Sequence, residues 1–142
     1  MSELLAETLA LLRIKTKVRT TLELMPLIRR GLPPASLESL AREMDMPTLA
    51  TAESIGLAKR TVARRLHEKQ TLDPEQSERV VRLARILAQA TAILGSREKA
   101  RRWLRKPNRA LGGEVPVEML DTDIGAQAVL DELGRIDHGV FA

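Results

Sequence analysis

Apolar residues recur every three or four positions in most segments of the chain, which is the spacing of one face of an α-helix. They are mainly aliphatic: tyrosine is absent, and tryptophan and phenylalanine occur once each. Such a composition is typical of helices that pack on helices, so the expected fold class is all-α. The pattern predicts helices over residues 3–13, 26–31, 37–44, 48–54, 58–68, 74–94, 97–105 and 123–136, with one helical turn at 116–120.

Capping residues and glycines mark the expected helix ends. Segment 73–76 combines an aspartate that can cap, a proline at the first helical position and a glutamine that can reach back. It therefore predicts the start of the long helix, which is expected to end at Gly95. Ser36, Ser96 and Thr122 are expected to cap the helices that follow them.

The first 35 residues form an N-terminal region with a candidate dimer interface. Residues 14–21 are rich in basic and β-branched side chains, which disfavour a helix, so a connector is predicted there. Apolar residues seven positions apart can pair two helices, so residues 1–35 are expected to contribute to a homodimer. The residues at this interval are Leu4, Leu11, Val18 and Met25.

The segment around Gly56 follows the spacing of a helix-turn-helix. This motif needs a small residue where two helices touch, a glycine in the turn, and an aliphatic residue that packs the second helix against the first. Ala52, Gly56 and Val62 stand at these places. Ile55 and Leu57 are expected to be core residues on either side of the turn.

The helix after Gly56 is strongly cationic. Arginine can donate two hydrogen bonds to guanine, threonine can contact a thymine methyl group or a phosphate, and a helix N-terminus attracts phosphate. The sequence therefore predicts a helix that reads DNA. The predicted DNA-binding residues are Lys59, Arg60, Thr61, Arg64 and Arg65. An apolar residue is more usual at the position of Arg65, and Leu66 is expected to take that place.

Three arginines on the long helix leave two interpretations open. Arg79, Arg82 and Arg85 are spaced by three residues, which places them on one side of the helix. Either they hold the DNA backbone or they form a solvated face.

Charge is distributed unevenly beneath the net value of +4. Residues 58–71 carry five cations and one acid, and residues 97–109 carry seven cations and one acid. Residues 110–142 carry seven acids and one cation. Because the basic segments suit a polyanion and the acidic end does not, the pattern indicates two different partners.

The chain offers little for catalysis or for metal binding. It has no cysteine, and its two histidines, His67 and His138, are far apart. It also lacks a glycine-rich phosphate loop, so we expect no enzymatic activity, no metal and no cofactor. The N-terminus does not have the order of a signal peptide, and no apolar run is long enough for a bilayer. A cytoplasmic protein without membrane contact is expected.

The C-terminal third carries the most specific motif. Residues 96–140 read SREKARRWLRKPNRALGGEVPVEMLDTDIGAQAVLDELGRIDHGV, and upstream the chain reads GLAKRTVARRL and LDPEQSERVVRLARI. These segments resemble the Xre/MbcA/ParS family of antitoxins, whose C-terminal domain binds RES-type toxins. Within the motif, Trp103, Leu111 and the Gly112-Gly113 pair are interpreted as a structural corner.

The residue patterns and the resemblance together divide the helical chain into three expected parts. These are residues 1–35 for dimerisation, 36–94 for an Xre/Cro-like helix-turn-helix, and 95–142 for toxin binding. In the family the antitoxin's C-terminal end covers the toxin's NAD pocket, so the implied partners are operator DNA and a RES-type toxin that consumes NAD. The implied toxin-binding residues are Arg135, Asp137, His138, Gly139 and Val140.

Two other functions fit the residues. One is an ordinary helix-turn-helix repressor with an unknown partner domain. The other is an interaction protein whose basic helix pairs with acidic protein surfaces.

Overall fold

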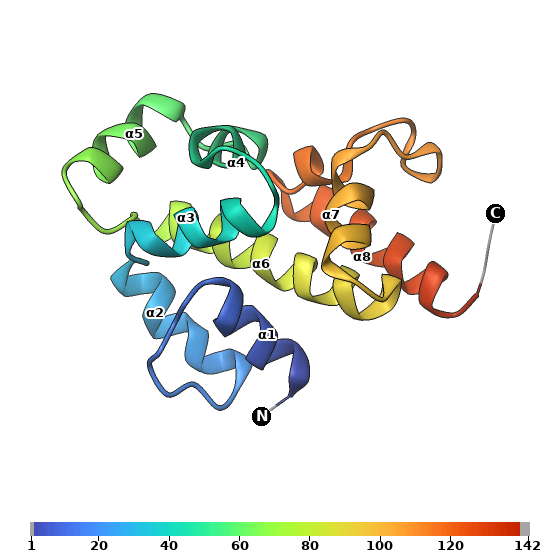
Figure 1. Cartoon of the computed structure of the whole chain (residues 1–142), viewed down its shortest axis with the longest axis horizontal. Coiled ribbons are helices and arrows are strands. Elements are labelled where there is room, and N and C mark those ends of the chain that lie inside the picture. Colours follow the sequence, from blue (N-terminus) through green and yellow to red (C-terminus); the bar gives the residue numbers. More distant parts are fainter. Residues whose placement is uncertain (1, 140–142) are drawn as a thin grey trace.

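Helix α6 (Pro74–Leu94) runs through the middle of the molecule and carries most of its packing (Figure 1). The computed structural model describes residues 2–139, and these contain helices and turns but no strand. The other helices are α1 (Glu3–Leu11), α2 (Leu24–Arg30), α3 (Pro34–Glu43), α4 (Thr48–Ser54), α5 (Lys59–His67), α7 (Arg97–Arg105) and α8 (Asp123–Asp137). Short 3-10 helices are η1 (Thr21–Glu23), η2 (Arg109–Leu111) and η3 (Pro116–Met119).

The all-α fold predicted from the sequence is confirmed. Helices α1, α2, α3, α7 and α8 all contact α6, while α4 and α5 continue from α3 as a pair (Figure 1). No helix within residues 2–139 is long and apolar enough to cross a membrane.

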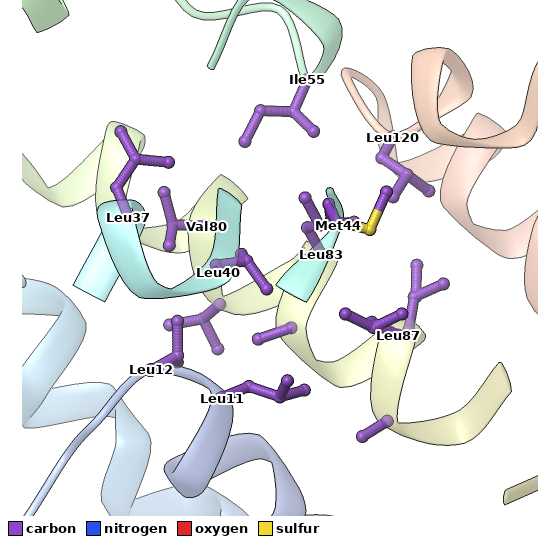
Figure 2. Close-up of a cluster of buried hydrophobic side chains, with 14 of the residues drawn as sticks. Leu11, Leu12, Leu37, Leu40, Met44, Ile55, Val80, Leu83, Leu87 and Leu120 are labelled. Atoms are coloured by element: carbon purple, nitrogen blue, oxygen red, sulfur yellow. The ribbon is translucent and has the colours of Figure 1, made fainter. Parts of the chain in front are cut away.

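One continuous hydrophobic core joins all parts of the chain. Figure 2 shows apolar side chains from α1, α3 and α6 converging with Ile55, which follows α4, and Leu120, which follows η3. Leu37, Leu40 and Met44 have no exposed surface, and neither do Leu83 and Leu87. Full burial of a side chain of this size contributes about 1.5–3 kcal/mol. The core therefore fixes the C-terminal segment against the helices that precede it.

The predicted start and end of the long helix are confirmed. Asp73 accepts a hydrogen bond from the backbone N–H of Gln76, and the Gln76 side chain accepts one from the N–H of Asp73. Pro74 occupies the first helical position. Gly95 ends the helix in the left-handed conformation, with φ +96°. Ser96 and Thr122 cap α7 and α8 as predicted.

The predicted cap at Ser36 is wrong. Helix α3 begins at Pro34, and Ser36 lies buried in its first turn. Its hydroxyl donates to the backbone oxygen of Leu12 at 2.7 Å, which ties α3 to the end of α1. A serine near a helix start can either accept from a local N–H or donate to a distant carbonyl. Here it donates to a buried carbonyl, which would otherwise lack a hydrogen bond within residues 2–139.

The predicted seven-residue dimer seam is also wrong. Leu11 and Val18 belong to the core, whereas Leu4 and Met25 are 43% and 40% exposed. Helix α1 ends at Leu11, so the four residues do not share a helix face. The connector predicted at 14–21 is confirmed as far as Thr20, and η1 begins at Thr21.

Arg97 fastens the C-terminal segment to the N-terminal helices. Its guanidinium pairs with Glu7 of α1 and with Glu43 of α3, the latter at 2.6 Å. Its Nε donates to the hydroxyl of Thr91 at 3.1 Å. Burial and, to a smaller extent, the charge of Arg101 lower the pKa of Arg97 from its ordinary value. This arginine therefore serves the fold and is not available to an external polyanion.

Candidate functional site

Helices α4 and α5 meet in the geometry that the helix-turn-helix spacing predicts. Ala52, Ile55 and Val62 have no exposed surface, and Leu57 is 7% exposed. Gly56 takes φ +83°, a conformation that side chains with a Cβ rarely adopt. The N–H of Leu57 donates to the carbonyl of Ala52 at 3.0 Å and closes the turn. The sequence prediction of this turn is confirmed.

Helix α5 presents cations to solvent in both its first and its last turn. Lys59, Arg60 and Arg64 are exposed, and Thr61 is half-buried. None of the three cations forms an ion pair with another side chain of residues 2–139. Since α5 begins directly after the turn, its positive N-terminal end and these side chains can approach one phosphate backbone together. Three of the five predicted DNA-binding residues are thus exposed on α5, and a fourth, Thr61, is half-buried on the same helix.

Arg65 differs from its neighbours on α5. It is half-buried, and its Nη1 donates to the carbonyl of Thr71 at 2.5 Å, which holds the loop between α5 and α6. Its Nε is buried without a partner in residues 2–139. The side chain turns toward the loop, where an apolar residue is usual, and Leu66 packs beside it against the core. The predicted outward placement of Arg65 is therefore wrong.

Arg79 of α6 supports the turn from behind. Its Nη1 donates to the carbonyls of Ile55 at 3.2 Å and Gly56 at 2.9 Å, and its Nη2 pairs with Glu75 at 3.2 Å. Only 22% of the side chain is exposed. Neither interpretation of this residue from the sequence was right, because its donors are directed at backbone carbonyls and not at DNA or solvent.

Arg82 makes the equivalent contact with the C-terminal segment. It donates to the carbonyl of Leu120 at 2.8 Å and pairs with Asp123 at the start of α8. Its side chain is 18% exposed, so Arg82 fits neither the DNA-backbone contact nor the solvated face that the sequence suggested. Of the three spaced arginines, Arg85 alone is exposed and fits the solvated face.

The turn and the C-terminal segment touch directly. A Cβ built on Gly56 would lie 2.5 Å from Nη1 of Arg79 and 2.7 Å from Cβ of Asp121. Asp121 stands between η3 and α8, so the segment that leads into the last helix rests on the helix-turn-helix turn. Gly56 is thus required for its backbone angle and also for the space around it.

Residues 103–120 form the corner that the sequence predicted. Trp103 and Leu111 are half-buried and pack against the core. The side chain of Asn108 accepts from the N–H of Ala110 at 2.9 Å. Gly112 and Gly113 both take positive φ, +69° and +83°.

The predicted toxin-binding residues gather at the end of α8. Arg135, Asp137, His138 and Gly139 are exposed, and Val140 lies outside the described residues. Arg135 donates to Glu132 at 2.9 Å, and the Nδ1 of His138 lies 2.7 Å from the carbonyl of Gly134. That contact leaves Nε2 of His138 accessible. No group of three acidic or histidine side chains between residues 2 and 139 is arranged to hold a metal ion.

Two stretches of the chain match known protein families. Residues 23–85 match the antitoxin Xre-like helix-turn-helix domain, and residues 89–139 match the antitoxin Xre/MbcA/ParS C-terminal toxin-binding domain. An Antitoxin Xre of Yersinia enterocolitica is 31% identical over 116 residues, which are 81% of this chain and 78% of the relative. The chain belongs to the Xre antitoxin family.

Other relatives have similar names. An Antitoxin Xre of Photorhabdus laumondii is 35% identical over 88 residues, covering 61% of this chain and 60% of the relative. A protein of a Sphingobium species named Prs ADP-ribosylating antitoxin is 29% identical over 124 residues, covering 81% of this chain and 78% of the relative. The Xre-family antitoxin described here therefore combines a helix-turn-helix with a toxin-binding domain.

Sequence reasoning missed the supporting contacts of this family member. The partners of Arg79 and Arg82 are backbone carbonyls at positions 55, 56 and 120. A backbone carbonyl has no sequence signature, since every residue carries one. The regular spacing of the arginines showed that they share a helix side but could not show what lies opposite.

Proposed function

We propose that this chain neutralises a RES-type toxin that consumes NAD, and that it represses its own operon by binding operator DNA as a homodimer. The observation that supports the proposal most strongly is that one chain carries two different exposed surfaces. An exposed cationic helix follows the helix-turn-helix turn, and an exposed polar end closes the toxin-binding domain. The name of the Sphingobium relative refers to ADP-ribosylation, a reaction that takes its ADP-ribose from NAD.

The end of α8 has groups that suit a nucleotide pocket. Arg135 and Asp137 supply opposite charges, and His138 supplies an imidazole with one accessible nitrogen. These groups can pair with the polar atoms of a toxin site that otherwise holds NAD, so the antitoxin would exclude the substrate by occupying its place. Asp123, at the start of the helix, pairs with Arg82 and anchors that end to α6.

The neutralisation test is co-expression with the protein encoded by the neighbouring reading frame, which the proposal requires to be a RES-type toxin. Growth and cellular NAD are measured with the full chain and with a chain that lacks residues 137–142. We expect the full chain to preserve NAD and the truncated chain to lose protection. Full protection by the truncated chain would contradict a contact at residues 137–140. An Arg60→Ala, Arg64→Ala double variant is the matched control and should protect as well as the wild type.

The DNA surface is proposed to consist of Lys59, Arg60, Thr61 and Arg64. Phosphate contacts by lysine, threonine, arginine and the helix N-terminus would position α5, and the arginines would also read base edges in the major groove. In a homodimer two such helices would bind half-sites about one helical turn apart.

The DNA test uses the promoter fragment of the chain's own operon. We expect the Arg60→Ala, Arg64→Ala variant to bind at least tenfold more weakly and to show a smaller salt dependence, by about 0.9 in the log–log slope for each lost phosphate contact. The matched control removes two exposed cations of the α1–α2 connector, Lys15→Ala with Lys17→Ala. Equal losses in both variants would mean that only net charge matters, and α5 would not be the reading helix.

A further inference from the structure

A groove of about 420 Å³ lies between α7 and the turn that joins α3 to α4. Its walls are formed entirely by charged residues. They are Asp45, Glu98, Arg101, Arg102, Arg105 and Lys106. Four cations against two carboxylates leave the groove net positive.

The groove's cations are only partly neutralised within the chain. Arg102 pairs with Glu98 at 2.7 Å. Arg105 donates to the carbonyls of Asp45 at 3.0 Å and Met44 at 3.5 Å, which satisfies donors but does not cancel the charge. Arg101 and Lys106 form no ion pair with any residue between 2 and 139.

Arg101 acts electrostatically on a second cation, Arg97. Arg101 is half-buried, and the two carboxylate partners of Arg97 lie on α1 and α3. Like charges at this separation repel, and the repulsion contributes to the lowered pKa of Arg97. An external anion in the groove would offset that repulsion.

The chemistry of the walls favours phosphate over a protein surface. The centre of a protein interface is depleted of charged residues, whereas all six lining residues of the groove are charged. Phosphate backbones are held by arginine, lysine and other polar donors without such a centre. Arginine in particular can donate two parallel hydrogen bonds to one phosphate.

Helix α7, which forms one wall of the groove, lies on the same side of α6 as α5 in Figure 1. In Figure 1 the molecule is viewed along its shortest axis, and α5 and the segment after α7 both lie along the upper edge. The C-terminal end of α7 points toward that edge, whereas α1 and α2 lie along the lower edge. Arg105 is the last residue of α7, and Lys106 follows it. A DNA duplex that ran along this edge from α5 would pass α7.

We propose that the α7 groove binds the phosphate backbone of the operator outside the half-site that α5 reads. The inference rests on the proposed DNA-binding function and adds a second, sequence-independent contact from within the toxin-binding domain. Arg101 and Lys106 supply the free donors, and Arg105 holds the groove wall to the end of α3.

The test compares DNA duplexes of two lengths from the chain's own promoter. One duplex ends at the half-sites, and the other extends by about one helical turn on each side. For Arg101→Ala with Lys106→Ala, we expect roughly tenfold weaker binding to the long duplex, no change on the short duplex, and a salt slope smaller by about two. Arg101→Gln with Lys106→Gln keeps the polar side chains and should give the same result.

The outcomes separate this inference from the proposed function. If the wild type binds neither duplex, the DNA-binding function itself is wrong. If Arg60→Ala with Arg64→Ala weakens binding while the groove variants bind both duplexes like the wild type, only the groove inference is overturned. Loss of toxin neutralisation by the groove variants with unchanged DNA binding would assign the groove to the toxin and would also overturn it.

Discussion

Helices α5 and α6 both carry regularly spaced arginines, but the two helices use them in opposite ways. On α5, Arg60 and Arg64 are exposed and have no ion pair in residues 2–139. On α6, Arg79 and Arg82 are mostly buried and donate to carbonyls of the helix-turn-helix turn and of Leu120. The same residue type thus supplies a free surface on one helix and internal support on the other.

The difference follows from what each helix packs against. Helix α5 packs on α4 through Val62 and leaves its far side open, whereas α6 is surrounded by other helices. An arginine on α6 therefore meets the ends of neighbouring elements, where backbone carbonyls lack helical partners. Hydrogen bonds between a charged donor and such carbonyls contribute about 1.5–3 kcal/mol each. Substitutions on the two helices should thus have opposite effects on folding and on binding.

The largest effect on folding is expected for the two α6 arginines together. Arg79→Ala with Arg82→Ala removes the donors to three carbonyls and the ion pair with Asp123. We expect the free energy of unfolding, measured by urea denaturation, to fall by about 3–5 kcal/mol. Arg85→Ala on the same helix is the matched control and should change it by less than about 0.5 kcal/mol. Similar values for the two variants would show that the α6 arginines do not support the turn.

A smaller loss is expected when the turn itself is changed. Gly56→Ala forces a Cβ into a positive-φ position and against Arg79 and Asp121, at 2.5 and 2.7 Å. We expect a loss of about 1–3 kcal/mol in the free energy of unfolding. Combining Gly56→Ala with Arg79→Ala should cost less than the sum of the two single changes, because the arginine is one of the clashing groups. Strict additivity would contradict this contact.

Arg65→Ala should affect folding more than it affects DNA binding, unlike changes to the exposed arginines of α5. The change removes the hydrogen bond to Thr71, but it also removes a buried Nε without a partner in the described residues. We expect a loss of about 1 kcal/mol in the free energy of unfolding. Operator affinity, measured by the same retardation assay as above, should change less than twofold. A tenfold loss of operator affinity with unchanged stability would contradict this prediction and would show that Arg65 contacts DNA.

The smallest effect on folding is expected for the exposed pair on α5. Arg60→Ala with Arg64→Ala should leave the free energy of unfolding within about 0.5 kcal/mol of the wild type, because neither side chain pairs with residues 2–139. Urea denaturation checks this. A loss above about 1 kcal/mol would show that these arginines support the fold, and the contrast between α5 and α6 would disappear.

Sequence patterns predicted the local structure of this chain well where the signals were short-range. The capping box at 73–76, the cap at Thr122 and the glycine of the turn depend on residues only a few positions apart. The error at Ser36 has the opposite cause, since its acceptor is the carbonyl of Leu12, 24 residues earlier. Likewise, the seven-residue spacing of Leu4 and Leu11 does not form the predicted dimer seam, because α1 ends at Leu11, before a second seven-residue repeat is complete.

By itself, the sequence determined the helices, the turn at Gly56, the distribution of charge and the motif of the toxin-binding domain. Only the tertiary structure decided which of the many arginines are free, because an arginine's long side chain is satisfied by whichever carbonyl or carboxylate packing brings within reach. Arg97 pairs with Glu43, which is 54 residues away in the sequence, and Arg82 donates to the carbonyl of Leu120, which is 38 residues away. Arg60 and Arg64, with the same side chain, find no ion pair in residues 2–139, since no element packs over their side of α5.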